Sequence, residues 1–171
     1  MKIVTIFAGR LYSFHYNDES ENELKRLLNL WNDPEYLHNF IYKHKHDIGN
    51  SVEVVIQQIL DNIEELEESL YELATGEFEK LDTFFKPLDN LEYHFRILSR
   101  QKGRKNYLRI YAIKIDENCF VITGGAIKFT HLMEERKHTI NELKKLDRCK
   151  QFLNEHGVFD NDSFYGFLIE Q

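Results

Sequence analysis

Apolar residues recur at helical spacing over one long stretch of the chain. Between Ser51 and Thr75 they fall every three or four positions, at Val52, Val55, Ile56, Ile59, Ile63, Leu66, Leu70 and Leu73. This spacing predicts an amphipathic helix with one buried face, and Gly76 is a natural stop. Its glutamate run, residues 64–68, is read as the solvated face of that helix. An acidic surface for a basic partner is the alternative.

A second pattern predicts a β-hairpin. Residues 107–115 and 119–127 are apolar on both alternating faces, which is typical of central strands covered by helices. Asp116, Glu117 and Asn118 supply the turn. Gly124 and Gly125 weaken a regular ladder and therefore predict a bulge or a close backbone approach. Lys128 would then be aimed by the end of the second strand.

Other segments complete an α+β chain. Residues 2–16 read as a strand or bent strand pair with Gly9 at the break. Three further helices are expected. One follows a Ser20/Glu23 capping box, one covers residues 35–47, and one runs from a Thr139/Glu142 capping box to Gly157. The basic stretch "RQKGRK" reads as a solvated turn, and the tail as a segment that docks its aromatic side chains on the body. We expect one domain: a strand plus helical extension over 1–83, then a small antiparallel sheet and a C-terminal helix over 84–171.

Charge is distributed unevenly along the chain. The net charge is −7, yet residues 1–87 hold 8 Lys/Arg against 17 Asp/Glu, whereas residues 94–150 hold 14 against 6. A basic segment can attract phosphates even in an acidic protein, because salt limits the range over which exposed charges act to about 8 Å at physiological ionic strength. The alternative is that the two halves neutralise each other across an internal interface.

Several function classes find no support in the sequence. The two cysteines, Cys119 and Cys149, have no C-x-x-C spacing and are expected to be small buried side chains. His44 and His46 lack a third ligand at credible spacing, so no metal site or cofactor is indicated. No apolar run is long enough to span a membrane, and the start of the chain does not resemble a signal peptide, so we expect a cytoplasmic protein without a membrane partner.

The stretch from residue 84 to about 150 resembles the RelE/ParE/HigB superfamily of bacterial toxins. The resemblance lies in "FFKPLDNLEYHFRILSRQKGRKNYLRIYAIKIDENCFVITGGAIKFT", which has the family's order of a leucine-containing turn, a strand ending in arginine, a loop, an arginine-containing strand and an apolar strand ending in lysine. "HTINELKKLDRCKQFL" is similar to the helix that follows. The first 80 or so residues lie outside this match.

The resemblance implies a RelE-like fold and metal-independent cleavage of messenger RNA, usually on the ribosome, by a toxin that a partner antitoxin inhibits. Arg109 and Lys128 stand where the family's strand arginine and closing lysine contact phosphate, and Arg96 stands at the arginine ending the preceding strand. The expected phosphate anchors are Arg100, Lys102, Arg104, Lys105, Arg136 and Lys137.

The general acid or base is not fixed by the resemblance. His131 is taken as the candidate, with His138 next in the chain and Tyr165 a distant third. ParE-like members keep the fold and act on DNA gyrase, so the fold alone does not decide the reaction. The alternative function is a non-catalytic protein-binding module, and the plain interpretation of Arg109 and Lys128 is that they are basic residues at strand ends.

Overall fold

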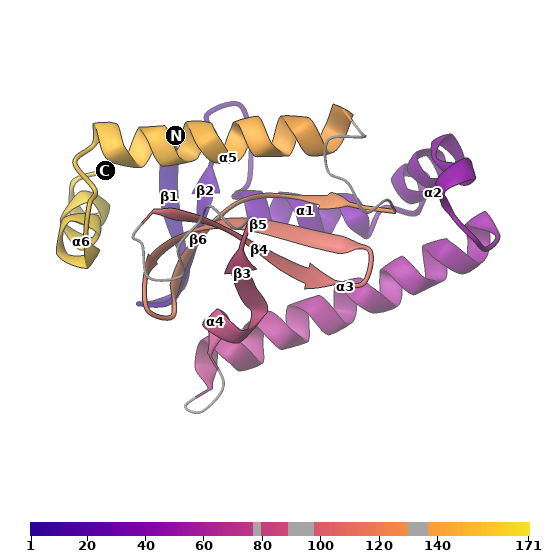
Figure 1. Ribbon diagram of the computed structural model, residues 1–171, viewed down its shortest axis with the longest axis horizontal. Helices are drawn as coiled ribbons and strands as arrows, with labels where there is room; N and C mark the ends of the chain where they lie inside the picture. The colour runs from indigo at the N-terminus through magenta and orange to yellow at the C-terminus, as the bar shows by residue number, and fades with distance from the viewer. Residues whose placement is uncertain (77–79, 89–97, 130–136) are drawn as a thin grey trace.

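The computed structural model describes residues 1–76, 80–88, 98–129 and 137–171. They form an α+β structure, as expected, with the strands gathered into one sheet and the helices on its two faces (Figure 1). The strands are β1 (Lys2–Phe7), β2 (Leu11–His15), β3 (Phe85–Pro87), β4 (Ser99–Lys105), β5 (Leu108–Asp116) and β6 (Cys119–Ile127). The helices are α1 (Glu23–Trp31), α2 (Pro34–Lys43), α3 (Val52–Thr75), α4 (Leu81–Phe84), α5 (Lys137–Glu155) and α6 (Asn161–Glu170), with a 3₁₀ turn η1 (Lys45–Asp47).

The sheet is larger than the small antiparallel sheet expected from the sequence, and it is mixed. Its six strands run in the order β1-β2-β6-β5-β4-β3. All neighbours are antiparallel except β2 and β6, which pair in parallel from Leu11↔Phe120 to Ser13↔Ile122. The predicted N-terminal strand pair, broken at Gly9 with φ +77°, is therefore an integral edge of the sheet. Both halves of the chain contribute to it.

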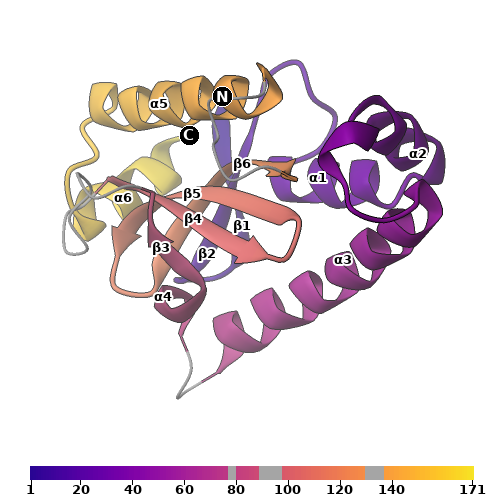
Figure 2. The same cartoon turned by 45° about the vertical axis from the view of Figure 1, so that its right-hand side comes forward.

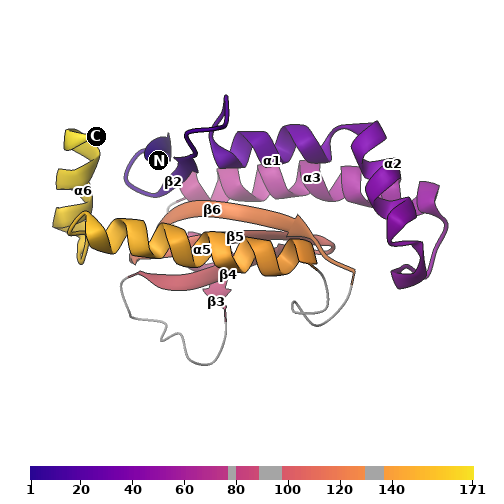
Figure 3. The same ribbon diagram turned by 90° about the horizontal axis from the view of Figure 1, so that it is seen from above.

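Helices cover both faces of the sheet. Helices α1, α2 and α3 pack one apolar cluster against residues such as Leu108, Ile110 and Ile122, and Figure 2 shows α3 running along this face. Helices α5 and α6 pack a second cluster against Tyr111, Ile113 and Val121, and Figure 3 shows α5 lying over the strands. The hairpin of β5 and β6 is central, as its two apolar faces predicted. In the part of the chain that the structure describes, no helix is long and apolar enough to cross a membrane.

The Gly-Gly pair lies just beyond the last residue of β6 that pairs with β2, while β6 stays paired with β5. Ladder pairing shifts between Ile122 and Gly124, so Thr123 forms the predicted bulge. At this bulge and after it, side chains bond to the β6 backbone. Tyr16 Oη donates to the Thr123 carbonyl at 2.5 Å, and the Gly125 N–H donates to Glu142 Oε2 at 3.1 Å. A Cβ on Gly124 would lie 1.9 Å from Glu142 Oε2. The close approach predicted for the glycines is thus confirmed.

Several predicted boundaries are wrong. Helix α1 begins after Asn22, whose side chain accepts from the Lys25 N–H, and not after a Ser20 capping box. Thr139 is buried inside α5 instead of capping it. The expected loop "RQKGRK" is most of strand β4, which pairs with both β3 and β5. Its Gly103 leaves room for the Phe84 ring, since a Cβ there would lie 1.9 Å from Phe84 Cε1. The tail does dock, through Phe164, which is fully buried against Tyr12 in a helix that was not predicted.

Candidate functional site

Four neighbouring basic side chains lie at one end of a sheet face that also carries Arg100 and Lys86. Arg104 of β4 is directly opposite Arg109 of β5, and Lys102 lies two residues before Arg104, so all three share one face. Arg109 pairs in turn with Ala126 of β6, which places Lys128, two residues further, on that face as well. We call Lys102, Arg104, Arg109 and Lys128 the cationic face.

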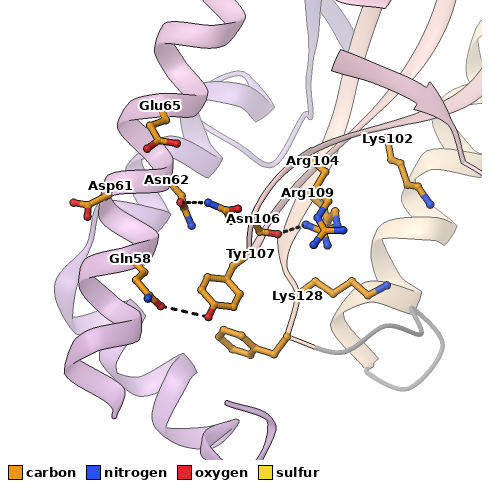
Figure 4. A pocket seen from close by; sticks show the side chains of 11 residues that line it. Gln58, Asp61, Asn62, Glu65, Lys102, Arg104, Asn106, Tyr107, Arg109 and Lys128 are labelled. Carbon is orange, nitrogen blue, oxygen red and sulfur yellow. Dashed lines mark hydrogen bonds between the residues drawn. The ribbon is translucent and has the colours of Figure 1, made fainter. Parts of the chain in front are cut away.

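The cationic face borders a cavity of about 650 Å³ at the end of the sheet. Figure 4 shows the four basic side chains turned toward the same space, with the Lys128 and Lys102 ammonium groups at its outer side. The wall on the other side is helix α3, which contributes Gln58, Asp61, Asn62 and Glu65, and the β4–β5 turn with Phe129 completes the lining. The two walls of the cavity therefore differ in charge, with cations on the sheet and carboxylates on the helix.

Arg109 is held in place by backbone carbonyls. Its Nη1 donates to the carbonyl of Asn106 at 2.5 Å and to that of Leu108 at 2.9 Å. Burial, together with the neighbouring positive charge of Arg104, lowers the pKa of the Arg109 guanidinium to about 10. A cation whose charge is penalised in this way is stabilised by an arriving anion.

The turn that carries Asn106 is attached to α3 by three consecutive residues. Lys105 forms an ion pair with Glu65 at 2.8 Å, the Asn106 amide donates to Asn62 at 2.8 Å, and Tyr107 Oη donates to Gln58 at 3.3 Å. Residues 58, 62 and 65 lie on one face of a helix, because they are four and three positions apart. We call these three contacts the α3 clamp.

Aromatic rings adjoin the cationic face. Phe129 contacts Tyr107 edge-on, with ring centroids 5.4 Å apart, and its other neighbours include Phe40 at 6.1 Å. His138 accompanies this group, with its ring 5.3 Å from Phe40 and its Nε2 3.0 Å from the carbonyl of Ile127. His138 does not line the cavity. The rings supply a partly exposed apolar border beside the four cations.

The structure brings together some of the predicted site residues and separates others. Arg109, Lys128, Lys102 and Arg104 share the cavity. Lys102 also donates to the carbonyl of Leu88 at 3.1 Å.

Arg100 lies on the same face of β4 but forms an ion pair with Asp147 of α5 at 3.1 Å, and Lys105 points to the opposite face, toward Glu65. Lys137 is exposed at the start of α5 and does not line the cavity. His131, Arg96 and Arg136 lie outside the described residues. Tyr165 is remote from the site, where its Oη donates to the Gly9 carbonyl at 3.5 Å.

Sequence reasoning missed the α3 wall of the cavity. The polar residues Gln58, Asn62 and Glu65 at helical spacing, followed much later by an Asn-containing turn, were the only signal for the clamp. The left-handed Asn106, at φ +46°, is typical of asparagine in a tight turn. Among the described residues, no group of three or more His, Cys, Asp or Glu side chains could hold a metal ion.

Comparison with known proteins adds no family to these observations. Neither family models, nor curated protein sequences, nor solved structures give a match to this chain.

Proposed function

We propose that the cationic face binds the phosphodiester backbone of single-stranded RNA and cleaves it without a metal ion. The observation that supports this most strongly is the convergence of Arg109 and Lys128, from two neighbouring strands, on one solvent-open cavity. Basic side chains at unrelated strand ends would have no reason to share a concavity. A phosphate is the common biological ligand that several convergent cations recognise.

The charge distribution of the cavity restricts how a strand could lie in it. Asp61 on α3 repels phosphates and Glu65 is already paired with Lys105, whereas the four cations on the sheet attract phosphates. A strand would therefore follow the sheet side, with its bases free to meet the rings of Tyr107 and Phe129. Stacking on aromatic side chains next to a basic groove is a common way to bind single-stranded RNA.

The proposed reaction is attack of a ribose 2′-hydroxyl on the adjacent phosphate. The 2′-oxygen forms a bond to phosphorus, the bond from phosphorus to the 5′-oxygen breaks, and a cyclic phosphate results. The 2′-hydroxyl loses its proton and the leaving 5′-oxygen gains one. Arg109 and Lys128 would stabilise the growing negative charge on the phosphate. His131 stays the predicted proton carrier, on sequence grounds.

The biological role follows from the resemblance to the RelE/ParE/HigB toxins. We propose a toxin of a toxin–antitoxin pair that acts on messenger RNA, with the ribosome as the setting and an antitoxin as inhibitor. A RelE-like core at residues 84–150, extended by the N-terminal strands and helices, is part of the same proposal. The extension has a role in it, because α3 forms one wall of the cavity.

Cleavage can be tested with a fluorescent single-stranded RNA and the purified protein in EDTA. We expect products with cyclic phosphate ends, and no products from the same RNA carrying 2′-O-methyl groups. Arg109→Gln and Lys128→Gln should each reduce the rate by about 10²–10³-fold, as removal of a charge-stabilising donor does. The matched control is Lys2→Gln/Arg148→Gln, at exposed sites outside the cavity lining. Intact RNA after long incubation, both in EDTA and in a second assay with ribosomes in magnesium buffer, would overturn the cleavage proposal.

A further inference from the structure

A second cavity, of about 590 Å³, lies on the side of α3 that faces the N-terminal strands. Its floor is apolar and is formed where β1, β2, α1 and α3 meet, by Phe7, Leu11, Leu24, Leu28 and Leu70. We call this cavity the α3 groove. It shares no lining residue with the cavity at the cationic face.

The rim of the α3 groove is acidic. Glu67, Glu68 and Glu72 line it, and none of the three forms an ion pair with any residue the structure describes. Tyr71, on the same rim, is 60% exposed and contacts Phe7 edge-on, with ring centroids 5.6 Å apart. A ligand that covers the apolar floor and brings positive charge to the acidic rim would complement this surface.

We propose that the α3 groove binds a basic amphipathic helix of a partner protein. Apolar side chains at helical spacing would fill the floor, as in other helix-in-groove complexes, and flanking Lys or Arg residues would pair with the three glutamates. The exposed ring of Tyr71 would pack on the partner helix from the rim, and tyrosine is enriched among the residues that contribute most to interface affinity. This inference is independent of RNA cleavage.

Other occupants fit the charges less well. An anionic membrane surface would be repelled by the three glutamates. A second copy of the chain could present Phe159 or Ile169, at the start and end of α6, but these lie among Asp160, Asp162 and Glu170, so two acidic surfaces would meet. Tyr42 lies next to Lys43 and Lys45, but the other exposed side chains around it on α2 are polar, so it offers a single ring and no apolar face at helical spacing. The charges of the groove therefore favour a foreign, basic partner.

The experiment uses the full chain and a fluorescent synthetic peptide of about 15 residues, built from leucine and lysine with the leucines on one helical face. Binding is measured by anisotropy. We expect Glu67→Gln/Glu72→Gln to weaken binding roughly threefold to tenfold, since exposed charge pairs contribute modestly. The matched control, Glu53→Gln/Glu170→Gln, makes the same charge change at exposed sites outside the groove and should leave affinity unchanged.

The apolar part of the proposal is tested at Tyr71. Tyr71→Ala should weaken binding of the leucine–lysine peptide, whereas Phe159→Ala, which also removes an exposed ring, should not. Equal binding to all four variants would show that the peptide binds elsewhere and would overturn the proposal. So would a wild-type dimer that Tyr71→Glu dissociates in analytical ultracentrifugation, because the groove would then hold a second copy.

Discussion

The carbonyl of Asn106 accepts a hydrogen bond from the Arg109 guanidinium at 2.5 Å, while the Asn106 side chain donates to Asn62 of α3 at 2.8 Å. One turn residue therefore connects the N-terminal helical half of the chain to the arginine at the centre of the cationic face. We infer that the acidic half positions the basic site, in addition to covering the sheet.

This connection predicts that Asn106 affects RNA binding although it carries no charge. Asn106→Gly keeps the left-handed conformation at φ +46° but removes the bond to Asn62, so RNA affinity should fall. Because Asn62 is buried, the lost bond should also cost about 1–3 kcal/mol of stability. Asn106→Ala removes the same bond and adds strain of about 1 kcal/mol, so it should lower the melting temperature further. Anisotropy with single-stranded RNA and thermal unfolding of both variants measure the two effects. Unchanged affinity in both would disprove the positioning role.

Arg109 should reduce stability while supporting binding. Its pKa is lowered to about 10, so the folded protein binds fewer protons than the unfolded chain between that pH and the ordinary arginine value, and stability rises with pH there. Below pH 10 the cost of holding the buried charge is fully present. Arg109→Met should therefore raise the melting temperature at pH 7 while weakening RNA binding. A lower melting temperature, with the RNA affinity of the wild type, would contradict this.

The two glycines of β6 should differ in their tolerance of a methyl group. A Cβ on Gly125 would lie 2.7 Å from the backbone oxygen of Arg109, which cannot move freely, whereas a Cβ on Gly124 meets the Glu142 side chain. We expect Gly125→Ala to cost about 2–3 kcal/mol and Gly124→Ala about 1–2 kcal/mol, as overpacking does. Gly49→Ala, which meets nothing within 4 Å, is the control. Urea unfolding measures all three.

Glu142 should make stability depend on pH. Burial raises the pKa of its carboxyl, so the folded protein binds more protons than the unfolded chain. The free energy of unfolding therefore falls as pH rises from about 4.3, the ordinary glutamate pKa, through the pKa in the folded protein. Glu142→Gln keeps an acceptor for the Gly125 N–H and removes the charge. The variant should gain stability relative to wild type at pH 7.5 compared with pH 4.5, by urea unfolding. A difference independent of pH would show that Glu142 keeps its ordinary pKa.

The sequence predicted those elements whose own periodicity is strong. Helix α3 occupies Val52–Thr75, within one residue of its predicted bounds, because its apolar face is unbroken and Ser51 and Gly76 mark its ends. The central hairpin is similarly placed, because both faces of β5 and β6 are buried. Local pattern and tertiary packing agree in these elements.

The rest depended on contacts between distant residues. Strand β4 reads as a polar loop, and only its position between β3 and β5 makes it a strand. The parallel pairing of β2 with β6 has no local signal, so the size of the sheet was underestimated. The cations were found by their type, whereas the α3 wall was missed, because residues 58–65 meet the turn at 105–107 only in the folded chain.

The central claim is that Arg109 and Lys128 bind the same phosphodiester. Single-stranded RNA affinity should be measured against salt for the wild type, Arg109→Gln, Lys128→Gln and the double variant. If both side chains contact one strand, each loss should reduce the slope of log affinity against log salt by about 0.7, and the double variant should lose less affinity than the sum of the single losses. Salt slopes equal to that of the wild type, with affinities within twofold of it, would contradict the account.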